Sequence, residues 1–200
     1  ARYFEYKGQL KFVQQADPEL LRGFTIHFYG SGGLSTFTGR KYARAIEATS
    51  KERGIKVQVH SRATKLNLMS HACKAAGQVM WPQFDNNPRA AYEGLYAGMP
   101  LFISTTAGVP EQLLEQSFVT PVEWNAPLPY FNTKLGRYME NVKANLESRP
   151  LRREVVEYTL TALNPDNVYW EICERIGICS HRERIRGVVD DEGDLDGDAT

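Results

Sequence analysis

Two acidic residues separated by seven others, Asp85 and Glu93, flank a predicted helix start in this 200-residue chain. Asn87 and Pro88 are typical of such a start, because Asn accepts hydrogen bonds from free backbone amides and Pro has no amide to leave unpaired. The first amides of a helix attract phosphate, and a carboxylate further along can accept hydrogen bonds from sugar hydroxyls. This stretch could hold both halves of a nucleotide; the alternative is that Glu93 is a solvated helix side chain.

A second candidate group lies near the start of the chain, where Arg2 and Lys7 flank a predicted turn before Gly8. Their cationic heads could converge on one anion, or each could be an ordinary surface charge. A glycine-rich turn at residues 30–33 follows a predicted strand but matches neither common phosphate-loop pattern. A purely structural turn and a close approach to a ligand are both open for Gly30.

Histidines and cysteines supply further candidates for chemistry. His60 and His71 could act as general bases, yet neither has an acidic partner at a recognisable spacing, so hydrogen-bonded structural histidines are the alternative. The three cysteines lack the spacing of a metal site, and the acidic C-terminus contains only part of a calcium-loop pattern. We therefore expect no metal site, and cysteine usage favours a cytoplasmic location.

Strands and helices alternate along the chain at the interval typical of a parallel sheet with helices on both faces. Strands are predicted at residues 25–29, 55–60, 79–81, 101–104 and 118–122. Helices are predicted from Gly8 to about residue 16, at 39–53, 64–76, 88–98, 130–148, 151–163 and 165–176, with a helical turn opening at Pro110. The helix at 64–76 should turn Leu66, Met69, Cys73 and Ala76 toward the core. The fold class is therefore α/β, a Rossmann-like parallel sheet with extra C-terminal helices, in which Tyr158 and Leu160 pack inward and Tyr169 and Trp170 are core or interdomain residues.

Composition is that of a globular domain, with 42% hydrophobic and 11% aromatic residues and zero net charge. All 24 lysines and arginines precede residue 187, whereas six of the 24 acidic residues lie between Asp190 and Asp198. The body is therefore basic and could attract an anionic ligand. We expect residues 182–200 to form a disordered acidic tail, and we expect neither a transmembrane segment nor a nucleic-acid partner.

The acidic pair belongs to a longer pattern. Glu93 is followed by Tyr96-Ala-Gly-Met-Pro100, a short strand and Gly108-Val-Pro-Glu111. This run resembles the signature of the retaining, nucleotide-sugar-dependent glycosyltransferases of the GT-B fold, glycosyl transferases group 1. The segment from Arg2 to Gly8 is similar to the Gly-Arg…Lys-Gly pattern that begins their second domain. Asp85 stands where that family usually has Glu, and Ala1 stands where it has Gly.

The resemblance implies that residues 1–181 are the C-terminal, donor-binding domain and that an N-terminal domain, upstream of Ala1, supplies most of the acceptor site. Arg2 and Lys7 would bind the donor diphosphate, Asp85 would orient the transferred sugar, and these three would carry catalysis. Glu93 would bind the ribose, and the loop at residues 105–108 would close over the sugar. Further donor contacts are implied for Asn86, Asn87, Arg89, Ser61, Arg62, Gly30 and Gly108.

The expected function is transfer of a sugar from a UDP- or GDP-sugar to a glycan, lipid or protein acceptor, with retention of configuration and without a metal or a tightly bound cofactor. Peripheral association of the full-length protein with a membrane is compatible with this. Two alternatives stay open: a noncatalytic nucleotide-binding or interaction module, and a sugar-nucleotide epimerase. The nucleotide base, the sugar and the acceptor depend on a few pocket contacts that the sequence does not locate.

Overall fold

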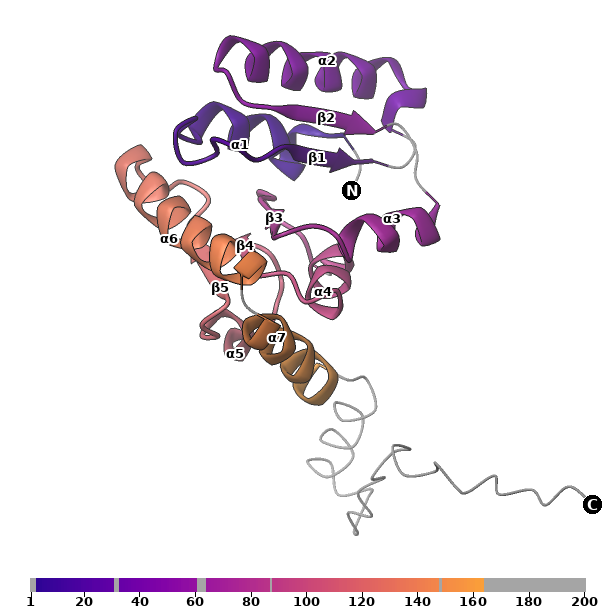
Figure 1. Ribbon diagram of the computed structural model, residues 1–200. Helices are drawn as coiled ribbons and strands as arrows, with labels where there is room; N and C mark the ends of the chain where they lie inside the picture. Colours follow the sequence, from indigo (N-terminus) through magenta and orange to yellow (C-terminus); the bar gives the residue numbers. More distant parts are fainter. Residues whose placement is uncertain (1–2, 31–32, 61–63, 87, 148, 164–200) are drawn as a thin grey trace, which may run out of the picture. The chain divides into compact units, whose positions relative to one another are not determined.

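The computed structural model describes residues 3–30, 33–60, 64–86, 88–147 and 149–163 (Figure 1). Residues 1–162 form one compact unit, which contains every element discussed below. In chain order these elements are η1 (Glu5–Lys7), α1 (Gln9–Gln15), β1 (Ile26–Tyr29), η2 (Gly33–Ser35), α2 (Phe37–Glu52), β2 (Val57–His60), α3 (Lys65–Ala72), β3 (Gln78–Met80), α4 (Arg89–Tyr96), β4 (Leu101–Ser104), α5 (Glu111–Leu114), β5 (Val119–Val122), α6 (Leu128–Glu147) and α7 (Arg149–Ala162).

Every strand pair in the described residues is parallel, as the alternation of strands and helices predicts. β1 pairs with β2, and β4 lies between β3 and β5. The hydrogen bonds thus form two sheets, where the sequence predicted one. The N-terminal segment connects them: the hydroxyl of Tyr3 donates to the carbonyls of Phe28 and His60 at 2.7 and 2.8 Å, and the amide of Gln83 donates to the carbonyl of Tyr6 at 2.7 Å.

The two sheets share one hydrophobic core. β4 is fully buried along its length, and the ring of Phe102 meets Phe12 of α1 and Phe131 of α6 edge-on at 5.9 and 5.5 Å. Trp81, at the end of β3, packs edge-on against Phe131 at 5.1 Å. Partly buried apolar residues of β1 and β2 complete the same cluster. Burial of these aromatic side chains supplies much of the apolar driving force for folding.

Helix boundaries follow local chemistry, and some differ from prediction. α2 begins at Phe37, two residues before the predicted start, because Thr36 caps it: Oγ1 accepts a hydrogen bond from the amide of Gly39 at 3.1 Å. α4 ends at Tyr96, two residues before the predicted end, and the predicted stop residue Gly98 follows with a positive φ of 74°. The prediction that Cys73 faces the core is wrong: α3 ends at Ala72, and Cys73 is exposed beyond it.

The predicted extra C-terminal helices are present as α6 and α7. The hydroxyl of Tyr138, on α6, donates to the carbonyl of Gln78 at 2.9 Å, and complete burial raises the pKa of that phenol. On α7, the guanidinium of Arg152 donates to two carbonyls. One is that of Ala97, the residue that caps the end of α4, and the other is that of Cys73, the residue that follows α3. Leu160, predicted to pack inward, is 53% exposed. The predicted helix at 165–176, with Tyr169 and Trp170, and the predicted acidic tail lie outside the described residues.

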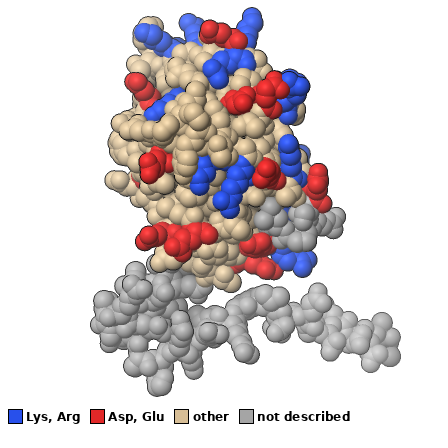
Figure 2. Space-filling view, turned by 90° about the vertical axis from the view of Figure 1, so that its left-hand side faces the viewer, with Lys and Arg blue, Asp and Glu red and all other residues tan. Residues whose placement is uncertain are grey.

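On the face shown in Figure 2, basic and acidic side chains are interspersed rather than gathered by sign. Within the described ranges, no helix combines the length and the apolar character that a membrane span requires.

Candidate functional site

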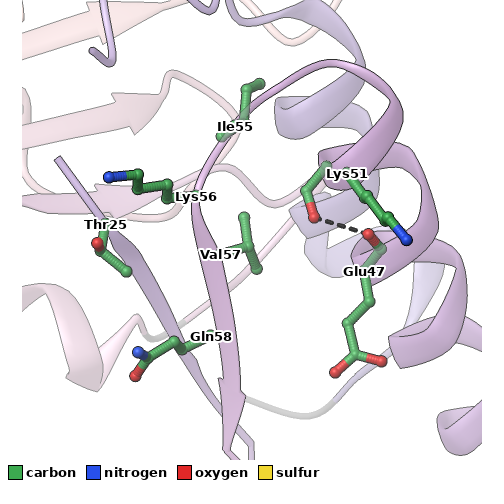
Figure 3. A pocket seen from close by; sticks show the side chains of 8 residues that line it. Thr25, Glu47, Lys51, Ile55, Lys56, Val57 and Gln58 are labelled. Carbon is green, nitrogen blue, oxygen red and sulfur yellow. Dashed lines mark hydrogen bonds between the residues drawn. The ribbon is translucent and has the colours of Figure 1, made fainter. Parts of the chain in front are cut away.

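A hollow of about 410 Å³ lies between α2 and β2 (Figure 3). It sits at the amino ends of β1 and β2, and none of the sequence-predicted site residues that the structure describes lines it. Its walls are formed by Thr25, Glu47, Ser50, Lys51, Ile55, Lys56, Val57 and Gln58. The side chains of Lys51 and Lys56 point in different directions, so they do not converge on one anion. Ligands of parallel α/β sheets bind at the carboxyl ends of the strands, which lie at the end of the sheet opposite to this hollow.

Three loops meet at the carboxyl ends of β3 and β4: the N-terminal loop with Lys7, the loop at residues 81–86, and the loop at residues 105–108. Asp85 and Ala107 form an isolated parallel bridge, and the amide of Gly108 donates to the carbonyl of Asp85 at 2.5 Å. The bond from Gln83 to Tyr6 attaches the first loop to the second. Backbone hydrogen bonds therefore fix the loops that carry three predicted site residues, Lys7, Asp85 and Gly108.

Gly108 is needed for this close approach. A Cβ atom at this position would lie 3.0 Å from the carbonyl oxygen of Asp85 and 3.1 Å from that of Asn86, closer than ordinary side-chain contacts. A residue with a side chain would push the two loops apart. The predicted donor residues Asp85, Asn86 and Gly108 are therefore neighbours in space, although Gly108 lies 22 positions after Asn86 in the sequence.

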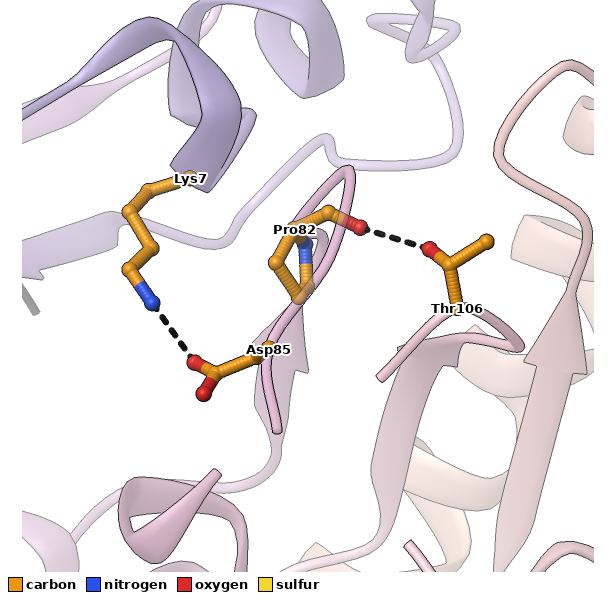
Figure 4. A network of polar contacts seen from close by, with 4 residues as sticks. All are labelled: Lys7, Pro82, Asp85 and Thr106. Carbon is orange, nitrogen blue, oxygen red and sulfur yellow. Dashed lines mark hydrogen bonds and ion pairs between the residues drawn. The ribbon is translucent and has the colours of Figure 1, made fainter. Parts of the chain in front are cut away.

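The loop at residues 105–108, predicted to close over a sugar, is fastened to its neighbour. The hydroxyl of Thr106 donates to the carbonyl of Pro82 at 3.0 Å (Figure 4). It also shares a 2.6 Å hydrogen bond with the buried hydroxyl of Ser104. Together with the Gly108 bond, these contacts make the loop part of the site's rigid wall. Preorganised donors and acceptors of this kind bind a ligand without a cost of rearrangement.

The ammonium of Lys7 and the carboxylate of Asp85 form an ion pair, with Nζ and Oδ2 2.6 Å apart (Figure 4). The side chains are only 18% and 17% exposed, so water screens the pair weakly. The ammonium of Lys7 also lies 5.1 Å from the ring centre of Tyr6. The pair can offer a cation to an anionic ligand and a carboxylate to hydroxyl groups within one small area.

α4 follows directly after the Asp85 loop, but its start differs from prediction by one residue. Pro88 occupies the capping position instead of the first helical one, because its ψ of 63° lies outside the helical region. Pro88 provides no side-chain cap, and the predicted cap, Asn87, lies outside the described residues. Glu93 is half-buried in the middle of the helix, Arg89 is exposed, and Glu93 forms no ion pair with any residue that the structure describes.

The carboxyl ends of β1 and β2 carry a separate cluster of aromatic side chains. The rings of Tyr29 and His60 stack at 4.3 Å, and Nδ1 of His27 lies 3.1 Å from Nε2 of His60. His71, from α3, meets Tyr29 edge-on at 5.6 Å. Burial, and then the nearby His27 and His71, lower the pKa of His60, so its imidazole is neutral near pH 7. Gly30 completes the cluster with a 3.4 Å bond to the carbonyl of His60.

This cluster contains residues that sequence reasoning missed. His27 and Tyr29 stand two apart on one strand, so they share a face, and the parallel register places Tyr29 beside His60. Tyr3 also reaches this edge; burial raises its pKa to about 12, which keeps its hydroxyl a donor to the carbonyls of Phe28 and His60. The sequence alone shows that residues 27 and 29 share one face of a strand. It does not show the register between β1 and β2, which places Tyr29 beside His60.

Four predicted site residues, Arg2, Ser61, Arg62 and Asn87, lie outside the described residues. Among the residues that the structure does describe, no group of three or more histidine, cysteine, aspartate or glutamate side chains is arranged to hold a metal ion. The residues brought together are Lys7, Asp85, Asn86 and Gly108, with α4 and Glu93 immediately following in the chain.

This architecture matches solved glycosyltransferase structures of the GT-B fold. A UDP-forming α,α-trehalose-phosphate synthase from Burkholderia xenovorans superposes with a TM-score of 0.59 at 16% identity, over 89% of this chain and 42% of that one. TarM gives a TM-score of 0.64 at 14% identity, over 87% and 33%. A trehalose-6-phosphate protein from E. coli, bound with UDP-2-fluoro glucose, gives 0.60 at 15% identity, over 89% and 42%.

The predicted GT-B-type α/β domain is therefore confirmed at the level of the fold. The chain spans less than half the length of each of these three solved proteins, consistent with one domain of such proteins. No family model and no curated protein sequence matches this chain significantly.

Proposed function

We propose that this chain is the donor-binding domain of a retaining glycosyltransferase and binds a nucleoside diphosphate sugar at the carboxyl ends of β3 and β4. One observation carries the proposal: the Lys7–Asp85 ion pair is held where three rigid loops meet, directly before the start of α4. The fold shared with glycosyltransferases supports it. At under 20% identity, that likeness supports the fold, and the activity rests on the site.

Each group has a chemical role in this proposal. Lys7, with Arg2 and the first amides of α4, binds the diphosphate and stabilises the negative charge that develops as the sugar leaves. Glu93 lies four residues beyond the first residue of α4, about 6 Å along the helix axis, and accepts hydrogen bonds from the ribose hydroxyls. Asp85 orients the transferred sugar through its hydroxyls.

Several finer features belong to the same proposal. A UDP-sugar is the first donor to test, because one matching structure is described as UDP-forming and another as bound with UDP-2-fluoro glucose; a GDP-sugar is the second. Retention of configuration and the absence of a tightly bound cofactor follow from the sequence resemblance. A cytoplasmic location is supported by the free, exposed thiol of Cys73, which is compatible with a reducing compartment.

Calorimetry with UDP and GDP tests the donor site. The wild-type chain should bind one of the two nucleotides. Glu93→Gln should weaken that binding by a factor of about 10 to 100, because the loss of a charge-assisted hydrogen bond costs roughly 1.5–3 kcal/mol. Glu140→Gln, which changes an exposed glutamate on α6, is the matched control and should bind as the wild type does.

The outcomes separate the competing functions. If the wild-type chain binds neither nucleotide, or if Glu93→Gln and wild type bind equally well, the donor-site proposal is wrong and an interaction module is favoured. With full-length protein, transfer from a UDP- or GDP-sugar to an acceptor, followed by NMR of the anomeric proton, should show retention. Interconversion of nucleotide sugars without an acceptor would identify an epimerase instead.

A further inference from the structure

Three aromatic side chains are stacked beside the Lys7–Asp85 pair: Phe4, Tyr6 and Phe84, which together form an aromatic ladder. The ring centres of Phe4 and Tyr6 are 5.7 Å apart with planes 17° from parallel, and those of Tyr6 and Phe84 are 5.4 Å apart at 20°. Phe84 immediately precedes Asp85, and Lys7 lies over Tyr6. The aromatic ladder and the ion pair therefore share the same two loops.

Phe84, at one end of the aromatic ladder, is not a core residue. It is 57% exposed, whereas Phe4 and Tyr6 are partly buried beneath it in the stack. Its loop is held by the backbone bonds of Gln83 and Asp85, so the ring is presented from a fixed support. Single exposed apolar side chains are common on protein surfaces. Phe84 differs from them because two further rings and a fixed backbone support it beside a polar site, so its free face is held ready for a flat ligand.

The surroundings of Phe84 favour a neutral ligand with hydroxyl groups. Its neighbours in the loop, Gln83 and Asn86, are exposed and uncharged, and both donate and accept hydrogen bonds. The nearby charges of Lys7 and Asp85 compensate each other. Among the described residues, Phe84 is the one large exposed hydrophobic residue in these three loops, so the apolar surface is about one ring wide.

A saccharide fits this combination. The C–H groups on one face of a pyranose carry small positive charges and pack against the negative face of an aromatic ring, while the hydroxyls at the edge meet polar side chains. A lipid chain would leave Gln83 and Asn86 unpaired and would need a wider apolar surface.

We propose that the aromatic ladder is a stacking site for an acceptor saccharide, which lies face-on against Phe84 beside the sugar being transferred. Its role as an acceptor site rests on the proposed function; saccharide binding itself does not. In the transfer, an acceptor hydroxyl oxygen bonds to the anomeric carbon of the donor sugar, the bond from that carbon to the diphosphate oxygen breaks, and the hydroxyl proton leaves with the nucleoside diphosphate. The acceptor class is therefore a glycan rather than a lipid or an unmodified protein.

Saturation-transfer NMR on the 200-residue chain tests the site with maltose, cellobiose, lactose and N,N′-diacetylchitobiose as probes. Irradiation of aromatic protein resonances should transfer magnetisation to the ring protons of at least one of these disaccharides. Phe84→Ala should weaken that binding about threefold to tenfold, whereas Phe84→Tyr, which keeps the ring, should bind as the wild type does. Phe37→Ala, which removes a 77% exposed ring on α2, is the matched control and should change nothing.

Each remaining outcome decides the proposal. It is overturned if none of the four disaccharides binds, or if Phe84→Ala binds as tightly as wild type and Phe84→Tyr do. Phe84-dependent sedimentation with vesicles of phosphatidylcholine and phosphatidylglycerol, without saccharide binding, would overturn it in favour of a lipid surface. UDP and GDP affinities measured on the same samples test the stacking site and the donor site separately. If saccharide binding depends on Phe84 but neither nucleotide binds, the stacking site is supported and the proposed donor-binding function is wrong.

Discussion

The Lys7–Asp85 ion pair places a negative charge beside the cation that we propose for the donor diphosphate. The pair is mostly shielded from solvent, so the two charges act on a neighbouring ligand more strongly than surface charges would. A diphosphate at this site is attracted by Lys7 and repelled by Asp85. The carboxylate therefore lowers donor affinity while it orients the sugar, and the two residues should have opposite effects on nucleotide binding.

Removing each charge in turn tests whether Lys7 and Asp85 have opposite effects on nucleotide binding. Asp85→Asn should bind UDP about threefold to tenfold more tightly, because it deletes a repulsive charge near the diphosphate, and Lys7→Met should bind it at least about tenfold more weakly. Isothermal titration at low and high salt measures both changes, which should shrink as salt screens the charges.

The matched control for this pair lies at the surface. Arg22 and Glu19 also form an ion pair, but their side chains are 75% and 68% exposed, so Glu19→Gln should leave UDP affinity unchanged. Equal losses of affinity in Asp85→Asn and Lys7→Met would show that the pair acts as a structural unit and not as a diphosphate site.

At the scale of elements, the junction of η1 and α1 positions the whole site. Gly8 ends η1 and caps α1 with a φ of 71°, a conformation that side chains disfavour. A Cβ atom there would overlap the carbonyl oxygen of Trp81 and the ring of Trp124. The N-terminal loop can therefore lie against the end of β3, with Lys7 next to Asp85, only because residue 8 has no side chain.

Gly8→Ala should consequently lower the free energy of unfolding by roughly 3 kcal/mol or more, through both backbone strain and overlap. Gly136→Ala is the control, since its Cβ would meet only Leu20, at 3.8 Å, in the middle of α6. Gly136→Ala should raise the free energy of unfolding by about 0.5–1 kcal/mol, because Ala favours a helix interior more than Gly does. Urea denaturation followed by circular dichroism measures both; equal effects of the two substitutions would refute the role given to Gly8.

At the scale of the molecule, one aromatic core joins two sheets that share no strand-to-strand hydrogen bonds in the described residues. Phe102 and its ring contacts with α1 and α6 lie at the centre of that core. Because residues of β1 and β2 pack against the same cluster as those of β3 and β4, neither sheet can lose its core separately. Residues 1–162 should thus unfold as one cooperative unit.

Phe102→Leu tests this cooperativity. The substitution should lower stability by about 1–2 kcal/mol and should shift the urea midpoint seen by far-ultraviolet circular dichroism and by the imidazole NMR signals of His27 and His60 together. Phe37→Leu, on the exposed face of α2, should shift neither. A shift of the circular dichroism midpoint without a shift of the histidine signals would show that the β1–β2 sheet unfolds independently.

Local structure and the class of fold follow from the sequence alone. The apolar run of β4 and the positive-φ position of Gly98 are properties of a few consecutive residues, and short-range geometry decides them. The alternation of strands and helices requires parallel strands, because only a crossover connection returns the chain in the same direction. The resemblance of residues 85–111 to glycosyltransferases also predicts which loops hold the donor site, and that prediction awaits the binding experiments above.

Which residues of those loops meet is a property of the tertiary structure. Lys7 contacts Asp85 across 78 residues of sequence, and Phe84 continues a stack that begins at Phe4. His27, Tyr29 and His60 meet because of the register between β1 and β2. Such contacts depend on how the loops dock over a common core. Packing and backbone hydrogen bonds between distant segments determine that docking, and the residue pattern within one segment contains no information about it.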